Sequence, residues 1–129
     1  MSGYLLDTGV ALLAGSTPEM LSGRVRKAIE RGPAFLSVVS YWEVTIKFMK
    51  GTLEVGDPRH WHRQTLTELG LRRLLYRPEH VEELLLLPPI HQDPFDRALI
   101  AQAIAEDLTL LTTDSTIPKY ISDRFRVIC

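Results

Sequence analysis

Short apolar runs alternate with longer segments of helical periodicity, and this alternation restricts the fold more than any other feature of the chain. Strands that alternate with helices are typical of βαβ units and a parallel sheet. The pattern therefore predicts a mostly parallel five-stranded sheet with helices on both faces. The strands are expected where short runs are rich in Leu, Val, Ile or aromatic residues. These runs cover residues 4–6, 34–39, 71–76, 108–112 and 124–128.

Helix starts are marked by capping residues and prolines. A capping residue precedes proline at 17–18, 57–58 and 93–94, and Ser40 has Glu43 three residues later, which is the spacing of a capping box. No repeat or long linker interrupts the chain, and 129 residues suit one domain, so we expect a single domain over 1–129. The helices are expected at residues 8–14, 18–31, 41–50, 58–69, 79–87 and 94–106, with a short turn after Ser115.

Charge and cysteine content restrict the class of protein. Fifteen basic and sixteen acidic residues give a net charge of −1, so the chain lacks the global positive field of a general duplex-DNA binder. Cys129 is the single cysteine, which excludes an intrachain disulfide and a cysteine-based metal site and favours a reducing compartment. The start has no basic leader, and the longest later apolar run, 84–87, is far too short to span a bilayer, so we expect a cytoplasmic protein without membrane association.

Four carboxylates are expected at one edge of the predicted sheet. Asp7 directly follows the first strand, Glu43 lies about one helical turn after the second, and Asp114 ends the fourth. Asp96 lies in the first turn of the helix that leads into the fourth strand. Because ligands of such sheets bind outside the carboxyl ends of the strands, these four acids are the candidate site.

Clustered carboxylates raise one another's pKa and oppose folding, so such a cluster is usually neutralised by a cation. Hard oxygen ligands favour Mg²⁺ or Mn²⁺. Mg²⁺ held by carboxylates and substrate phosphate suits hydrolysis of a phosphodiester by an activated water. The residues therefore indicate a metal-dependent nuclease, in which Asp7, Asp96 and Asp114 hold metal and Glu43 binds metal through water or activates the water.

Each acid also has a purely structural interpretation. Glu43 fits a capping box with Ser40, and Asp96 fits a partner for the dipole of its helix. Asp93 is better explained as a helix cap than as a ligand, whereas Asp7 and Asp114 fit turns. Four acids supplied by separate elements to one sheet edge nevertheless favour a shared role.

Neighbouring side chains are candidates for supporting roles. The hydroxyls of Thr8 and Thr112 are possible partners for the carboxylates or for ligand water, and Arg97, Lys47 and Lys50 are possible basic groups near the edge. The segment 59–63 combines His, Arg and Trp in a pattern that suits base stacking. We favour an amphipathic helix there, with Trp61 packed inward and the His and Arg side chains in water.

Four strings resemble, in order and spacing, the PIN-domain ribonucleases, and most of all VapC-type toxins of bacterial toxin–antitoxin pairs. The strings are residues 4–8 (YLLDT), 40–44 (SYWEV), 91–103 (HQDPFDRALIAQA) and 110–114 (LLTTD). They are spread over essentially the whole chain, and the third is the most specific. Gly9 is a departure, since many members of the family carry a polar residue there.

The resemblance implies a three-layer α/β/α fold with strand order 3-2-1-4-5 and cleavage of single-stranded RNA with Mg²⁺ or Mn²⁺. It also implies an antitoxin partner, and we expect a homodimer. By position in the motifs, Asp7, Glu43, Asp96 and Asp114 match the acidic quartet of the family, and Thr112 matches a supporting hydroxyl. Asp93 matches the motif of only a subgroup.

Other classes of function remain open on the sequence. Aspartyl phosphotransfer also uses an acid after the first strand, but Gly9 stands where a dehalogenase-type phosphatase needs its second Asp. A binding module that keeps the fold without turnover is a further alternative, as is a nuclease that acts outside a toxin–antitoxin pair. Exposed apolar side chains on helices would serve a binding module, whereas the complete set of four acids favours an enzyme.

Overall fold

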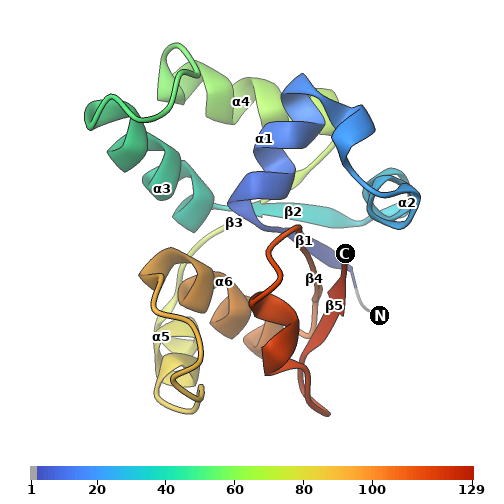
Figure 1. Cartoon of the computed structure of the whole chain (residues 1–129), viewed down its shortest axis with the longest axis vertical. Helices are drawn as coiled ribbons and strands as arrows, with labels where there is room; N and C mark the ends of the chain where they lie inside the picture. Colours follow the sequence, from blue (N-terminus) through green and yellow to red (C-terminus); the bar gives the residue numbers. More distant parts are fainter. Residues whose placement is uncertain (1–2) are drawn as a thin grey trace.

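The computed structural model describes residues 3–129 and shows a five-stranded parallel sheet between helical layers (Figure 1). The strand order is β3-β2-β1-β4-β5, so the predicted α/β fold with order 3-2-1-4-5 is confirmed. β1 lies at the centre, with Leu6 paired to Leu36 on one side and to Leu111 on the other. The strands are β1 (Tyr4–Leu6), β2 (Ala34–Ser37), β3 (Arg72–Leu74), β4 (Thr109–Leu111) and β5 (Arg126–Ile128).

Successive residues of the strands supply two separate cores, because side chains of a strand point alternately to opposite faces. Leu5 and Leu110 belong to one core, and Leu6 and Leu111 belong to the other. All four side chains are fully buried. The sheet is therefore covered on both faces, as a parallel sheet requires.

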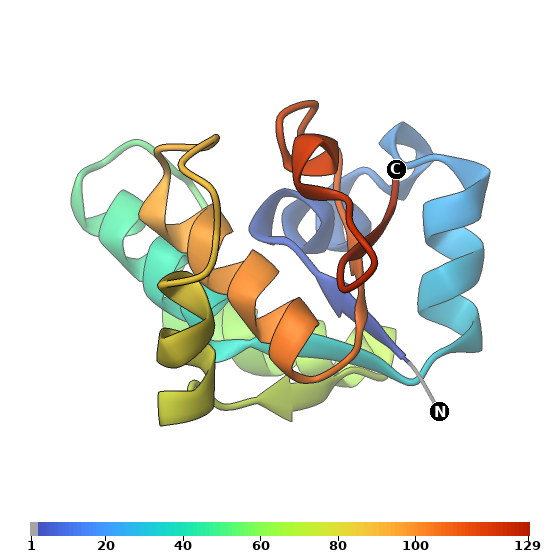
Figure 2. The same cartoon turned by 90° about the horizontal axis from the view of Figure 1, so that it is seen from below.

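Helices form the layers over these faces (Figures 1 and 2). α1 (Thr8–Ser16), α2 (Gly23–Arg31) and α4 (Pro58–Leu69) contribute to the core that contains Leu6. α6 (Pro94–Ala105) contributes to the core that contains Leu5, and α5 (Pro78–Leu84) packs beside it. α3 (Val38–Met49) leaves the end of β2 and packs against both α4 and α6.

The helix expected at 18–31 is instead two elements. A 3-10 helix, η1 (Pro18–Met20), ends before Leu21, whose backbone is extended and whose side chain is buried. Ser22 then caps α2, its hydroxyl accepting from Val25 N at 3.2 Å. The continuous helix was a wrong prediction because the chain turns at Leu21 to place that side chain in the core.

The start of α3 is also a correction. We expected a strand to residue 39 and a helix from 41 capped by Ser40, but β2 ends at Ser37, and this residue caps a helix that begins at Val38. The Ser37 hydroxyl accepts from Val39 N at 2.9 Å. Glu43 consequently lies in the second turn, so the capping-box interpretation of Glu43 is wrong.

Other boundaries differ by a few residues. β3, β4 and β5 are shorter than the apolar runs that predicted them, and α5 ends at Leu84 instead of residue 87. The turn expected after Ser115 is a 3-10 helix, η2 (Ile117–Tyr120). Within residues 3–129, no helix has the length and apolar character needed to cross a membrane.

Candidate metal centre

Asp7 is fixed at the carboxyl end of the central strand. Its backbone N–H donates to Leu111 O at 2.9 Å, which continues the ladder between β1 and β4. One carboxylate oxygen, Oδ1, caps α1 by accepting from Val10 N at 2.7 Å, and Oδ2 accepts from the hydroxyl of Thr112. With only 4% of its surface exposed, Asp7 is a buried acid whose orientation is set by three neighbours.

Glu43 reaches the same region from α3. Thr8 Oγ1 lies 2.6 Å from Glu43 Oε1 and 2.9 Å from Ser40 Oγ. Because a hydroxyl has one hydrogen and a carboxylate only accepts, Thr8 donates to Glu43 and accepts from Ser40. Lys47 Nζ lies 2.8 Å from the other oxygen, Oε2, one turn along the same helix. Glu43 is thus a buried carboxylate, and each of its two oxygens contacts a neighbouring side chain.

Asp93 and Asp96 have different roles at the start of α6. Asp93 Oδ1 accepts from Phe95 N at 2.9 Å and from Asp96 N at 3.4 Å, so Asp93 is the helix cap that the sequence favoured. The side chain of Asp96 does not cap the helix, is 14% exposed, and points toward Asp114 and His91.

Asp114 follows β4 and is the most exposed of the four acids, at 34% of its side chain. Its backbone N–H donates to Thr112 Oγ1 at 2.9 Å, and its Oδ1 accepts from Thr116 N at 2.7 Å. Thr112 is fully buried and contacts both Asp7 and Asp114. This single hydroxyl therefore connects the ends of β1 and β4.

His91 is a member of the cluster that sequence reasoning missed. Its Nε2 lies 3.0 Å from Asp96 Oδ2 and 3.1 Å from Asp114 Oδ2. His91, Asp96 and Asp114 each offer one ligand atom, and these three atoms lie within 4.8 Å of one another. Its place just before the Asp-Pro start of α6 was visible in the sequence, but nothing in the spacing showed where the ring points.

Burial and the charges of neighbouring acids both disfavour ionisation within the cluster. Burial raises the pKa of Asp7 to about 6, and the charges of Asp114 and Glu43 add to this rise against hydrogen bonds from Thr112 and Val10.

Asp96 behaves in the same way. Burial raises the pKa of Asp96 to about 7, with further contributions from the charges of Asp93, Glu43 and Asp7, while His91 opposes the rise. Asp114 differs: burial acts to raise its pKa, but the hydrogen bond from Thr116 N and the nearby His91 hold it below its ordinary value. Acids with such raised pKa values keep their protons to near-neutral pH. A bound cation would stabilise their ionised forms.

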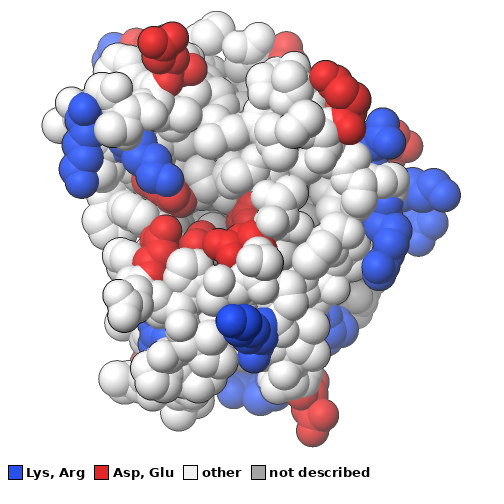
Figure 3. Space-filling view, in the orientation of Figure 1, with Lys and Arg blue, Asp and Glu red and all other residues white. Residues whose placement is uncertain are grey.

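Figure 3 shows Asp and Glu side chains gathered in a hollow of the molecular surface, with Lys and Arg side chains beside it. The donor set at the cluster consists of carboxylate oxygens with one imidazole nearby, which fits a hard divalent cation such as Mg²⁺ or Mn²⁺. We call Asp7, Glu43, Asp96 and Asp114 the acidic cluster. The four elements that carry these residues were those expected from the sequence.

The family model of the PIN domain matches residues 4–121, a span that contains the whole acidic cluster. The chain belongs to the PIN domain family. No curated protein is similar to it at a significant level.

Solved structures share the fold of this PIN domain at low sequence identity. VapBC2 from Rickettsia felis bound to a promoter DNA fragment has a TM-score of 0.71 at 14% identity, with 97% of this chain and 96% of that chain covered. DNA-bound VapBC from Salmonella typhimurium has a TM-score of 0.69 at 14% identity, with 99% of this chain and 98% of that chain covered. VapBC-5 from Mycobacterium tuberculosis is a member of the VapBC family of toxin–antitoxin systems. It has a TM-score of 0.63 at 16% identity, with 99% of this chain and 98% of that chain covered. The architecture is therefore shared over nearly the full length.

Two basic candidates have different surroundings in the PIN domain. Lys47 is paired with Glu43, and this hydrogen bond raises the pKa of Lys47. Arg97 Nη1 instead donates to Pro88 O at 2.9 Å and to Tyr120 Oη at 3.2 Å. Arg97 therefore braces the loop before α6, and within residues 3–129 it forms no ion pair with the acidic cluster.

The segment 59–63 of α4 is an amphipathic helix turn, as favoured, but with one difference. Trp61 packs against the core that contains Leu6, and Arg59 and His60 are exposed. His62 is buried and stacks on Tyr41, with ring centroids 4.3 Å apart. The expectation that all the His side chains there face water was wrong for His62.

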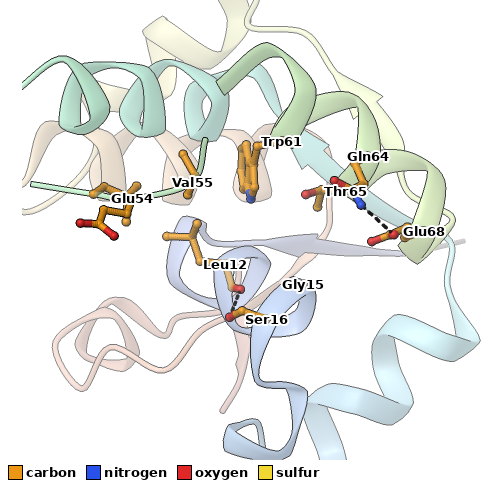
Figure 4. Close-up of a pocket in the computed structure, with 10 residues that line it drawn as sticks. Leu12, Gly15, Ser16, Glu54, Val55, Trp61, Gln64, Thr65 and Glu68 are labelled. Atoms are coloured by element: carbon orange, nitrogen blue, oxygen red, sulfur yellow. Dashed lines mark hydrogen bonds between the residues drawn. The ribbon is translucent and has the colours of Figure 1, made fainter. Parts of the chain in front are cut away.

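A cavity of about 300 Å³ lies between α1 and α4, away from the acidic cluster (Figure 4). Leu12, Leu53, Val55 and Trp61 contribute apolar side chains to it. Three of its polar side chains are engaged with each other or with the backbone: Gln64 Nε2 donates to Glu68 at 3.0 Å, and Ser16 Oγ donates to Leu12 O at 2.8 Å. None of the four acids lines this cavity.

Proposed function

We propose that this PIN domain is a metal-dependent endoribonuclease that hydrolyses phosphodiester bonds of RNA with Mg²⁺ or Mn²⁺. The observation that carries the proposal is the convergence of four carboxylates from β1, α3, α6 and the end of β4, with the pKa values of Asp7 and Asp96 raised to about 6 and about 7. Burial and the neighbouring negative charges both disfavour these anions, and a divalent cation relieves both effects. The four acids are the assigned site, and Thr8 and Thr112 are supporting residues.

Asp7, Asp96 and Asp114 would hold the cation. A bound divalent cation supplies Lewis acidity toward a phosphate oxygen and lowers the pKa of a bound water. Asp7 and Asp114 are suited to this because Thr112 contacts both and fixes their relative position. Asp93 is assigned no ligand role, since its Oδ1 is engaged as the cap of α6.

Glu43 is the residue that would orient and deprotonate the attacking water. Its Oε1 accepts from Thr8 and its Oε2 contacts Lys47, so the carboxylate is oriented by neighbours on both oxygens. A general base must be positioned before its pKa matters. Lys47 is 48% exposed, so its ammonium group is also accessible to a phosphate of the substrate.

We further propose that the chain is the toxin of a toxin–antitoxin pair, acts in the cytoplasm, and forms a homodimer. The likeness to VapBC structures supports the pairing. The outer side of α3 exposes Trp42 by 60% and Met49 by 74%, which suits a protein contact. Co-expression with the product of the adjacent reading frame, followed by co-purification and measurement of the molecular mass, tests both partners.

A nuclease outside such a pair, or a binding module that keeps the fold, is the alternative. The test of the proposed activity uses a structured RNA pool and single-stranded DNA of matching sequence, each with Mg²⁺, Mn²⁺ or a chelator. The proposal expects internal cuts in RNA that require metal. Cutting of DNA alone would show that the substrate is DNA and not RNA. RNA binding without cutting would favour the binding module.

A further inference from the structure

His91 bridges two acids that come from different parts of the chain. Its Nε2 lies almost midway between Asp96 Oδ2 and Asp114 Oδ2, at 3.0 and 3.1 Å. The side chain of His91 is 18% exposed, and the side chains of the acids are 14% and 34% exposed. The imidazole therefore occupies a half-buried position between two carboxylates of the acidic cluster.

The other ring nitrogen shows which hydrogen-bonding role Nε2 has. The backbone N–H of Asp93 donates to His91 Nδ1 at 3.2 Å. A nitrogen that accepts a hydrogen bond carries a lone pair, so the hydrogen of the neutral ring is on Nε2. Nε2 thus presents an N–H to Asp96 and Asp114, whereas a metal ligand would have to present a lone pair there.

The backbone around His91 is anchored independently of the acids. His91 N donates to Tyr120 Oη at 2.6 Å, and the same hydroxyl accepts from Arg97 at 3.2 Å. Asp93, which faces Nδ1, is itself fixed as the cap of α6. The ring is therefore oriented by the loop before α6 and by η2.

We propose that His91 is a positioning residue that holds Asp96 and Asp114 together through Nε2–H when no cation is bound, and that it releases them when a divalent cation binds. This inference rests on the proposed function, which places the cation at these carboxylates. The bridge stabilises the metal-free arrangement of the acids. It therefore competes with the cation and lowers its affinity.

The test measures the affinity for Mn²⁺ and Mg²⁺ by calorimetry, without substrate, for the wild type, His91→Ala, His91→Gln and His60→Ala. His60 is an exposed histidine of α4 and is the matched control. We expect His91→Ala to bind Mn²⁺ about tenfold more tightly, the effect of losing a hydrogen bond to charged groups. His91→Gln keeps an N–H donor and should lie closer to the wild type, and His60→Ala should match it.

The outcomes separate the two proposals. Weaker binding by His91→Ala would show that His91 is a metal ligand, and unchanged binding would show that its bridge does not oppose the cation; either result overturns the inference while the proposed function stands. If neither the wild type nor the variants bind Mg²⁺ or Mn²⁺, the proposed function fails. Circular dichroism and thermal melts establish that each variant is folded before its affinity is compared.

A second measurement observes the ring directly. Long-range ¹H–¹⁵N correlation spectra of histidine-labelled, metal-free protein should show His91 with its hydrogen on Nε2, and Mg²⁺ should shift these signals as the bridge is released. A hydrogen on Nδ1 in the metal-free protein, or a His91 signal that does not respond to saturating Mg²⁺, would contradict the inference.

Discussion

Thr8 Oγ1 lies 2.6 Å from Glu43 Oε1, so the residue that follows Asp7 orients the carboxylate supplied by α3. The two residues are 35 positions apart in the sequence. Their contact joins the end of the central strand to the second turn of α3 and fixes Glu43 relative to Asp7. The proposed division of roles between these two acids depends on this contact.

Replacing Thr8 by Val keeps the shape of the side chain and removes the donor to Glu43. We expect RNA cleavage at saturating metal to fall about tenfold, since one hydrogen bond to a charged group is lost. Thr8→Ser retains the hydroxyl and should keep most of the activity. A Thr8→Val protein that is folded and cleaves as fast as the wild type would contradict the role given to Glu43 orientation.

The pH dependence of stability in metal-free protein tests the electrostatics of the cluster. The pKa of Asp96 is raised from 3.8 to about 7 in the folded state. The folded state therefore keeps a proton that the unfolded state releases, and the wild type should lose stability as pH rises from about 4 to about 7. Asp96→Asn cannot ionise at this position and should show a smaller loss, the remainder coming from Asp7, whose pKa is also raised.

The expected gain of Asp96→Asn over the wild type grows between pH 4 and pH 8. A shift of this size corresponds to at most about 4 kcal/mol, and solvent near the cluster reduces it to roughly 1–3 kcal/mol. Denaturant unfolding with a chelator present measures the difference. Wild-type stability that is unchanged, or that rises over this interval relative to the variant, would count against a raised pKa of Asp96 in the folded protein.

Lys47 contacts Glu43 and is also half exposed beside the cluster. Lys47→Met removes a positive charge from the region where a phosphate would lie, so we expect KM for RNA to increase about fivefold or more, with a steeper loss at high salt in the wild type than in the variant. Lys50→Met is the control, because Lys50 forms no ion pair in the part of the chain that the structure describes. Equal effects of the two substitutions would show that only net charge matters.

His62 provides a prediction outside the site. It is buried against Tyr41, and its Nε2 has no hydrogen-bond partner among the described residues. Burial lowers the pKa of His62, and the charges of Arg73 and Arg63 add to this. Because the folded state disfavours the protonated ring, stability should fall as pH drops below about 6.5. In melts at pH 5 and pH 7, His62→Phe should weaken this dependence, and a variant with the full wild-type dependence would refute the assignment.

The sheet was predictable because each strand is a short apolar run between helices, and buried parallel strands leave this signal directly in the sequence. The positions of Asp7 and Asp114 followed from the strands that they end. The start of α3 was not predictable in the same way, since Val38 and Val39 have the β-branched side chains of a strand while Ser37 supplies the cap. Tertiary packing decided between these two local preferences.

His91 shows the limit of sequence reasoning at the site. Its contacts involve Asp93, Asp96, Asp114 and Tyr120, which lie on the loop, on α6, after β4 and in η2. No spacing along the chain encodes a ring orientation that depends on the start of α6, the segment after β4 and η2 together. Asp7, Asp96 and Asp114 were found because they lie near the ends or starts of elements, whereas His91 lies in a loop whose path is set by Arg97 and Tyr120.

The most direct test of the account is cleavage of an end-labelled, structured RNA pool by the wild type, Asp96→Asn and Asp123→Asn, with Mg²⁺, with Mn²⁺ and with a chelator. Asp123 is an exposed acid outside the cluster and is the matched control. We expect internal cuts by the wild type and Asp123→Asn that require metal, and a loss of about a hundredfold or more in Asp96→Asn. Cleavage by Asp96→Asn at the wild-type rate, or cleavage that continues in the chelator, would contradict it.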